Sequence, residues 1–338
     1  MSISITQAVS LAEHTTLKVG GEALRFAAVH DEDELVAAVA HAKKEKLSIT
    51  VLGGGSNVLV SDAGVSGMVI QNRIIGLALE DTNDATLLTA SAGEVFDDIV
   101  AEMADIGVWG LENLSHIPGS VGATPVQNVG AYGVDVADLI QSVRVYDTET
   151  QEYSELSNAD CQFGYRDSLF KKPEGKKYIV VSVTYAFAKD AGPTLDYRDL
   201  QNRFENTPTP HEVRDAVIEI RSAKFPNWKE VGTAGSFFKN PIIEQSRYAI
   251  LLETYPELPG FPTTDQKIKV PLGWILDKVL GLKGEGTEKV GTYQGQALVL
   301  INRGQATAED ITSFADEIVA KVKEATEIDV EWEVTKIK

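Results

Sequence analysis

Residues 117–133 read Ile-Pro-Gly-Ser-Val-Gly-Ala-Thr-Pro-Val-Gln-Asn-Val-Gly-Ala-Tyr-Gly, and we call this stretch the glycine wall because glycine recurs along it. Glycine leaves no side chain between the backbone and a ligand and reaches positive φ, while proline fixes the turns beside it. The stretch is apolar but has neither helical nor strand periodicity, so we expect an ordered wall against a large flat ligand. A glycine-rich turn between two strands is the alternative.

A second glycine segment lies upstream, at Gly53-Gly54-Gly55-Ser56-Asn57, and we call it the glycine loop. Residues 47–52 predict a short buried strand that leads into it. Consecutive glycines after a strand expose backbone N–H groups, and such concave backbone binds phosphate. The spacing matches neither the Rossmann fingerprint nor a P-loop. Together the two segments predict a dinucleotide site, with pyrophosphate at the glycine loop and a flat ring system at the wall.

The composition limits the class of protein. A chain of 338 residues with 43% hydrophobic and 24% charged residues predicts a soluble protein of two or three domains. A net charge of −19 argues against nucleic acid or an anionic membrane as partner, since both require a basic face. The single cysteine, Cys161, fits a reducing compartment. Neither a signal peptide nor a membrane-spanning apolar run is found, so we expect a cytoplasmic protein.

The hydrophobic pattern predicts a mixture of helices and strands. Residues 1–16 are expected to lead into the first strands. A last strand is expected at 328–334, and composition alone assigns its acidic face, which includes Glu333, to solvent. Capping-box patterns at Thr209 and Thr307 mark the starts of two helices. Helices are expected at residues 31–46, 96–106, 210–224, 243–254, 272–279 and 308–325, and the other strands at 47–52, 58–60, 67–71, 86–90, 142–146, 152–156 and 178–187.

Two further motifs are Gly235-Ser236-Phe237-Phe238-Lys239-Asn240-Pro241 and Tyr165-Arg166-Asp167-Ser168. With both glycine segments, in the same order, they make essentially the whole chain resemble the UDP-N-acetylenolpyruvoylglucosamine reductases (the MurB family), which are FAD enzymes of peptidoglycan precursor synthesis. The resemblance implies a bacterial, cytoplasmic, NADPH-dependent flavoenzyme that acts as a monomer and does not insert into membranes. It also implies that NADPH and UDP-N-acetylglucosamine enolpyruvate use one shared cleft in turn.

The fold that the resemblance implies is α+β. A two-part FAD-binding module of the vanillyl-alcohol-oxidase-like (PCMH) type precedes a C-terminal α+β substrate domain. The first FAD-binding part is expected at residues 1–73, joined by the C-terminal strand at 328–338, and the second part at 74–220. The substrate domain is expected at 221–327.

The implied reaction sets the chemistry that the site needs. Hydride passes from flavin N5 to C3 of the enolpyruvyl ether, charge builds on the neighbouring carboxylate, and C2 then takes a proton. Arg166 can hold a carboxylate through two hydrogen bonds, although an ion pair with Asp167 or another acid is the alternative. Ser236 matches the proton donor, with a turn hydroxyl as the alternative. Glu333 matches the acidic partner and would need a raised pKa.

The other residues are carried over by their positions in the motifs. Tyr197 matches a loop tyrosine of a longer subtype of the family. Lysines would supply the positive charge that the acidic chain lacks, although solvated surface lysines are the alternative. The five histidines show no metal-ligand spacing, so no metal is expected, and FAD is expected to be non-covalent. The implied FAD-binding residues are Gly53, Gly54, Gly55, Ser56, Asn57, Ile117, Gly119, Ser120, Gly122, Asn128 and Gly130. The implied substrate-binding residues are Tyr165, Tyr197, Lys224, Lys239, Asn240 and Gln296.

Two positions depart from the family pattern, and two other functions stay open. Ala123 stands where many members have glycine, and Thr335 stands where the family commonly has arginine near the flavin. An FAD oxidase of the same fold would need no Ser236. A non-catalytic flavin or nucleotide carrier would explain the glycine segments but not Arg166, Ser236 and Glu333 together.

Overall fold

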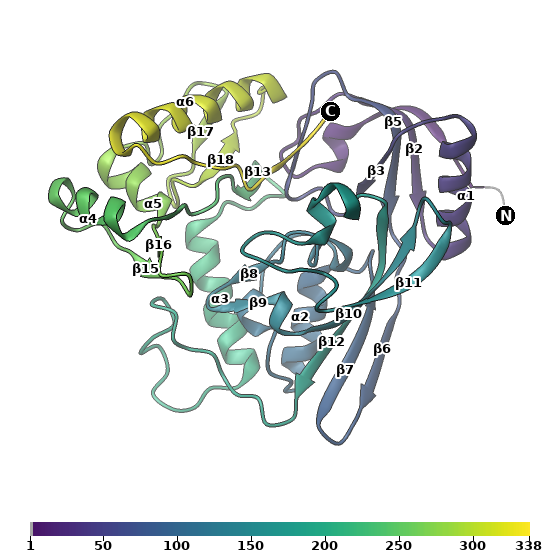
Figure 1. The fold of residues 1–338 in the computed structure, drawn as a ribbon, viewed down its shortest axis with the longest axis horizontal. Coiled ribbons are helices and arrows are strands. Elements are labelled where there is room, and N and C mark those ends of the chain that lie inside the picture. The colour runs from purple at the N-terminus through teal and green to yellow at the C-terminus, as the bar shows by residue number, and fades with distance from the viewer. Residues whose placement is uncertain (1–2) are drawn as a thin grey trace. The chain divides into compact units, whose positions relative to one another are not determined.

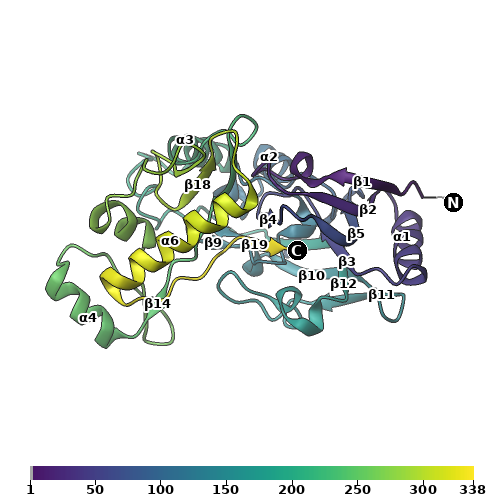
Figure 2. The same cartoon turned by 90° about the horizontal axis from the view of Figure 1, so that it is seen from above.

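The computed structural model of this chain describes residues 3–338, and Figures 1 and 2 show them as ribbons. The residues form two compact units, each assembled from segments that are distant in sequence. One boundary falls inside the glycine loop, between Gly55 and Ser56. Unit 1 consists of residues 3–9, Ala23–Gly55 and Ser66–Arg221, and unit 2 consists of Ser10–Glu22, Ser56–Val65 and Ser222–Lys338.

Unit 1 contains a four-stranded sheet in the order β1-β2-β5-β3. Its strands are β1 (Thr6–Ser10), β2 (Glu22–Val29), β3 (Ile49–Leu52) and β5 (Val65–Asn72), and β3 runs parallel to β5. Helix α1 (Glu32–Lys44) begins at Asp31, whose side chain accepts the Glu34 N–H at 2.7 Å. Residues on one face of α1, among them Leu35 and Val39, share a buried core with Met68 of β5. This sheet directs β3 into the glycine loop.

The second sheet of unit 1 has five strands in the order β11-β10-β12-β7-β6, and each neighbouring pair is antiparallel. Helix α2 (Phe96–Asp105) buries Phe96, Ile99 and Met103 in the same core as residues of this sheet. Helix α3 (Pro210–Lys224) starts at the predicted capping box, where Glu212 accepts the Thr209 N–H at 2.7 Å. The strands are β6 (Leu77–Asp81), β7 (Ala85–Ser91), β10 (Ile140–Asp147), β11 (Glu152–Ser157) and β12 (Tyr178–Ala188), and the short pair β8 (Gly130–Ala131) and β9 (Val134–Asp135) lies at the end of the wall.

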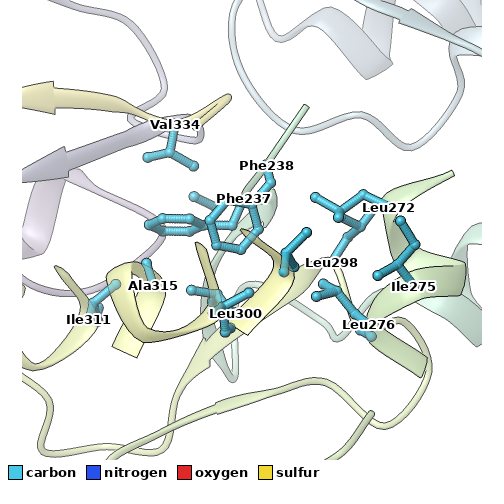
Figure 3. Close-up of a cluster of buried hydrophobic side chains, with 14 of the residues drawn as sticks. Phe237, Phe238, Leu272, Ile275, Leu276, Leu298, Leu300, Ile311, Ala315 and Val334 are labelled. Carbon is cyan, nitrogen blue, oxygen red and sulfur yellow. The ribbon is translucent and has the colours of Figure 1, made fainter. Parts of the chain in front are cut away.

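Unit 2 is built around a three-stranded sheet in the order β13-β18-β17 and helix α6 (Ala308–Thr326). Figure 3 shows Phe237 and Phe238 in its core, between residues of α6 such as Ile311 and the side chains of Leu272 and Ile275. Figure 2 shows α6 alongside the segment that leads to β19. The other bounds are β4 (Val58–Val60), β13 (Gly232–Ser236), β14 (Ile242–Ile243), α4 (Gln245–Thr254), β15 (Phe261–Pro262), β16 (Ile268–Lys269), α5 (Leu272–Trp274) with a π-helical turn at Ile275–Val279, β17 (Val290–Thr292), β18 (Val299–Asn302) and β19 (Thr335–Ile337).

The predicted helices and strands are present close to their expected bounds, except for the last strand. Burial alternates from Ile328 to Trp332 as expected, but not at Glu333, and the ladder strand is β19, which pairs in parallel with β4. The N–H groups of both Glu333 and Val334 point to the Phe237 carbonyl, at 2.9 and 3.5 Å, and this irregularity interrupts regular pairing. The sequence analysis also leaves out β1, which lies inside the segment 1–16 that is expected only to lead into the first strands, and β2, whose burial does not alternate strictly. It leaves out β6 and the three strands of the central sheet of unit 2 as well.

Candidate active site

The two glycine segments meet inside unit 1. A Cβ added to Gly54 would lie 2.9 Å from the Cα of Gly119, and a Cβ added to Gly53 would collide with the Ser120 hydroxyl. Side chains at these positions would therefore push the segments apart. Strand β3 delivers the glycine loop to this contact, and the first turn of α2 holds the wall. Two segments far apart in sequence thus form one surface of bare backbone.

Hydrogen bonds tie the wall to the segment that precedes α2. The Phe96 N–H donates to Gly119 O at 3.1 Å, the Val121 N–H to Glu94 O at 2.9 Å, and the Gly122 N–H to Ala92 O at 2.9 Å. A Cβ on Gly122 would come within 3.1 Å of the Ala92 Cα, so glycine is required there as well.

Arg166 lies at the far end of the wall. Its guanidinium donates to the carbonyl oxygens of Gly130 and of Asn128, the latter at 3.3 Å. The Asp135 carboxylate lies 3.4 Å from the guanidinium, so the ion pair foreseen as an alternative forms with another acid, Asp135. Asn128 is itself fixed, because its amide donates to Gly164 O at 3.0 Å. The Arg166 side chain is 16% exposed and carries a permanent charge.

The ring of Tyr197 also packs on the wall. It meets the ring of Tyr132 edge-on, with the centroids 5.1 Å apart. Asn113 holds both segments, because its amide donates to Tyr132 O and to Thr194 O, each at 2.8 Å. The segment that carries Tyr197 is therefore anchored next to the wall within unit 1.

In unit 2, hydrogen bonds join the serine motif, the C-terminal segment and the end of the glycine loop. Ser236 is the last residue of β13, lies opposite Val299, and follows Gly235, whose φ is +71°. The Glu333 N–H donates to Phe237 O at 2.9 Å, and Glu333 O accepts from the Asn57 amide at 3.2 Å. Glu333 is half-buried, whereas Asp329 and Glu331 are exposed. The assignment of this whole acidic face to solvent is therefore wrong at Glu333.

The expected substrate-binding residues of unit 2 include two members of the serine motif, Lys239 and Asn240. The Lys239 ammonium is 3.0 Å from the Glu331 carboxylate, and Glu331 is exposed, so this ion pair is weak. The Asn240 side chain accepts the Leu272 N–H at 3.0 Å, at the start of α5. Gln296 accepts the Leu298 N–H at 3.3 Å, and Lys224 is the half-buried last residue of α3.

Comparisons with known proteins identify two parts of the chain. Residues 23–154 match the model of an FAD binding domain, and residues 226–337 match that of the UDP-N-acetylenolpyruvoylglucosamine reductase C-terminal domain. A UDP-N-acetylenolpyruvoylglucosamine reductase of Neisseria meningitidis serogroup B is 39% identical over 314 residues, which cover 91% of this chain and 90% of the relative. One of Pseudomonas syringae pv. syringae is 37% identical over 339 residues, covering 98% and 99%.

The chain belongs to the UDP-N-acetylenolpyruvoylglucosamine reductase family. It is therefore an oxidoreductase of peptidoglycan precursor synthesis, and the predicted family is confirmed. The crystal structure of the MurB reductase from Thermus caldophilus covers 100% of both chains with a TM-score of 0.69 and 25% identity. The predicted fold class, a PCMH-type FAD-binding module followed by the C-terminal domain of this family, is confirmed as well.

In this reductase the predicted site residues fall into two groups. Unit 1 holds the wall, Arg166 and Tyr197, and unit 2 holds Ser236, Glu333 and the lysines. Of the three predicted catalytic residues, Glu333 is joined by a backbone hydrogen bond to Phe237, the residue that follows Ser236. Among residues 3–338 no cluster of His, Cys, Asp and Glu is suited to a metal ion, and no helix has the length and apolar character to cross a membrane.

The structure shows the surroundings of Ala123 and Thr335, the two residues that depart from the reductase pattern. A Cβ on Gly53 would lie 3.8 Å from the Ala123 Cβ, which is ordinary contact, so the extra methyl group of Ala123 fits beside the glycine loop. Thr335 is exposed, and its N–H donates to Asn57 O at 3.0 Å. Lys336 follows, with its ammonium 3.7 Å from the centroid of the Trp332 ring.

The sequence analysis misses two kinds of residue in this reductase. Asn113 is fully buried and lies only a few residues before the wall in sequence. The carbonyl groups that it binds, those of Tyr132 and Thr194, are farther along the chain. In the small sheet β14-β16-β15, Lys269 lies opposite both Ile242 and Phe261, so these side chains share one face, on which Ile242 and Phe261 are exposed. A polar residue next to a glycine-rich stretch could have drawn attention to Asn113, but no local pattern marks the Lys269 face.

Proposed function

We propose that this reductase converts UDP-N-acetylglucosamine enolpyruvate to UDP-N-acetylmuramate, with NADPH as the electron donor and FAD as the carrier. Family membership supports the overall reaction. The observation that carries the residue assignments is the set of hydrogen bonds that joins Glu333 to Phe237, the neighbour of Ser236, and to Asn57 of the glycine loop. These bonds support the proposal that Ser236 as proton donor, Glu333 as acid and the end of the glycine loop act together.

The residues present fit FAD. The contact between Gly54 and Gly119 leaves bare backbone from both segments, which suits a pyrophosphate beside a flat ring. We assign the pyrophosphate to residues 53–57 and the ring system to Ile117, Gly119, Ser120, Gly122, Asn128 and Gly130. Neither segment contains histidine or cysteine, which supports non-covalent binding. When bound and reduced, FAD supplies the hydride.

The chain's own residues would supply the rest of the chemistry. We assign Arg166 to the substrate carboxylate, because its guanidinium is always charged and the carbonyls of the wall fix its direction. Ser236 would donate a proton to C2 as C3 receives the hydride, so that both carbons of the double bond become saturated. NADP⁺ would leave earlier, in the first half-reaction, before the substrate enters the shared site. Glu333 would share a proton with the developing enolate and help return one to Ser236.

The remaining substrate contacts are proposed around these groups. Lys224, Lys239, Asn240 and Gln296 would bind the sugar diphosphate, and Tyr165 and Tyr197 would contact it from the wall side. The Lys269 face offers an exposed aromatic and a cation, a combination suited to a planar base. NADPH and substrate would use one site in turn.

We also propose a domain division and a setting. The FAD module would comprise 1–73 with 328–338, and 74–220, while 221–327 would form the substrate domain. Pairing of β19 with β4 supports the link between the C-terminal strand and the first segment, although both lie in unit 2. Family membership supports a monomer in the cytoplasm.

A visible spectrum of the purified chain tests this function. Flavin absorbance should bleach when NADPH is added without air and recover when UDP-N-acetylglucosamine enolpyruvate follows. Recovery with oxygen alone, at an equal rate, would favour an oxidase. A flavin that NADPH does not bleach would favour a carrier and would overturn the proposal.

A further inference from the structure

We propose that Asp97 and Arg214 form a positioning pair that fixes the backbone at the start of the glycine wall and so sets the affinity of the reductase for FAD. Neither residue belongs to the glycine segments or to the motifs that identify the family. The inference rests on the proposed location of FAD at the wall, and it adds two residues that act through the backbone and not by touching the cofactor.

The backbone that needs fixing is at His116, the residue directly before the wall. His116 has a φ of +61°, a left-handed conformation that L side chains rarely adopt. Both of its peptide groups are held. Its N–H donates to Asp97 Oδ1 at 2.5 Å, and its carbonyl accepts from Arg221 Nε at 3.2 Å. A strained residue in this place persists because its neighbours hold it.

Asp97 connects this strained residue to the contact between the two glycine segments. It lies in the first turn of α2, one residue after Phe96, whose N–H binds Gly119 O at 3.1 Å. Gly119 in turn packs against Gly54. A single helical turn therefore holds both ends of residues 116–119 and sets where the wall meets the glycine loop.

Arg214 of α3 fixes the orientation of the Asp97 carboxylate. Its two terminal nitrogens donate to the two carboxylate oxygens at 2.6 and 3.1 Å, and its side chain is only 12% exposed. Burial alone would raise the pKa of Asp97, but the hydrogen bonds from Arg214 and from the His116 amide outweigh it and lower this pKa. The carboxylate therefore stays ionised and remains an acceptor for the His116 N–H.

The same two helices provide a matched control. His211 of α3 contacts Asp105 of α2 at 2.8 Å, at the end of α2 that lies away from the wall, and both side chains are more than half exposed. Asp105→Asn removes the negative charge from this contact between the helices, as Asp97→Asn does at the other contact, and leaves the His116 backbone untouched. It therefore separates a general loosening of α2 against α3 from a specific effect on the wall.

The test compares the FAD dissociation constants of the full-length wild type, Arg214→Gln, Asp97→Asn and Asp105→Asn, from flavin fluorescence titrations of FAD-free protein. We expect Arg214→Gln and Asp97→Asn to bind FAD more weakly than the wild type by about tenfold or more. Asp105→Asn should bind FAD as tightly as the wild type. Arg214→Lys, which keeps the charge but loses the planar fork, should fall between wild type and Arg214→Gln. Thermal unfolding midpoints of the FAD-free proteins report any general loss of stability.

The results distinguish a specific effect on the glycine wall from a general loosening of α2 against α3. Unchanged FAD binding in Arg214→Gln overturns the inference, and so does equal weakening in Asp105→Asn. If Arg214→Gln does not fold, the comparison of Arg214→Lys with Asp105→Asn decides in the same way. Failure of the wild type to bind FAD would refute the proposed function instead.

Discussion

The ring of Tyr197 lies edge-on to the ring of Tyr132 at a centroid distance of 5.1 Å and an interplanar angle of 72°. Tyr132 belongs to the glycine wall, and Tyr197 belongs to the long connection between β12 and α3. Asn113 connects the two backbones with one amide group, while its own Oδ1 is buried and has no hydrogen-bond partner. An uncompensated buried oxygen is costly, so the two hydrogen bonds of the amide are the reason for an asparagine at this position.

Asn113→Ala should free the connection from the wall. Loss of both hydrogen bonds removes the connection between this segment and the wall backbone, so the segment should open more often. Arg198 and Arg203 lie in this segment, and we expect trypsin to cut there several-fold faster in the variant. Tyr197→Phe, which keeps the ring contact, is the control and should be cut at the wild-type rate. Equal cleavage of Asn113→Ala and wild type would contradict this role.

Ser236→Ala separates the two half-reactions. The variant lacks the proposed proton donor, so reoxidation of the reduced flavin by the enolpyruvyl substrate should slow by about 10²–10⁴-fold. Reduction of the flavin by NADPH should stay close to the wild-type rate, because that step needs no proton from Ser236. Stopped-flow absorbance measures both steps in the absence of air. Similar losses in both half-reactions would remove Ser236 from this role.

Gly54→Ala tests the contact between the glycine segments. The added methyl group would lie 2.9 Å from the Cα of Gly119, and the backbone there cannot rotate away as a side chain could. We expect FAD binding to weaken by about tenfold or more. Gly192→Ala is the control, since a Cβ there meets no atom within 4 Å and no positive φ is involved. Equilibrium dialysis with FAD would reveal the difference, and equal affinities in both variants would argue against the contact.

Several features of this reductase are predictable because their causes are local. The capping box of Thr307 and Asp310 lies within four residues, and α6 begins there as expected. The glycine loop and the wall are visible in the sequence because only glycine tolerates the close contact between Gly54 and Gly119. Local patterns of this kind need no knowledge of distant partners.

Other features depend on contacts across the sequence. The acidic alternation near Glu333 predicts a solvent face, but the Phe237 carbonyl and the Asn57 amide hold this residue half-buried. Asp97 looks like an ordinary acid in the first turn of a helix, and only the folded chain brings Arg214 to it. The family resemblance assigns a role to Glu333 but none to Asp97 or Arg214.

The stability of the chain should depend on pH in opposite directions through two buried carboxyl groups. Burial raises the pKa of Glu112, which is 1% exposed and accepts the Gly110 N–H at 2.6 Å. Above its ordinary pKa of 4.5 the unfolded chain binds fewer protons than the folded chain, so Glu112 costs stability as pH rises. Glu112→Gln keeps an acceptor for Gly110 and should raise the unfolding midpoint near neutral pH, with less effect in acid.

The effect of Asp147 on stability changes with pH in the opposite direction to that of Glu112. Burial alone would raise its pKa, but hydrogen bonds from Lys177, at 2.8 Å, and from the amides of Glu149 and Thr150 outweigh it and lower this pKa. Its contribution to the stability of the fold is fully present above the ordinary pKa of 3.8. It is lost as pH falls through the lowered value, because the unfolded chain binds this proton at a higher pH than the folded chain does. Asp147→Asn should therefore lower the unfolding midpoint at neutral pH and converge with wild type in acid. Thermal unfolding from about pH 3 to about pH 8 measures both variants, and two curves that shift in the same direction would contradict the assignment of the two signs.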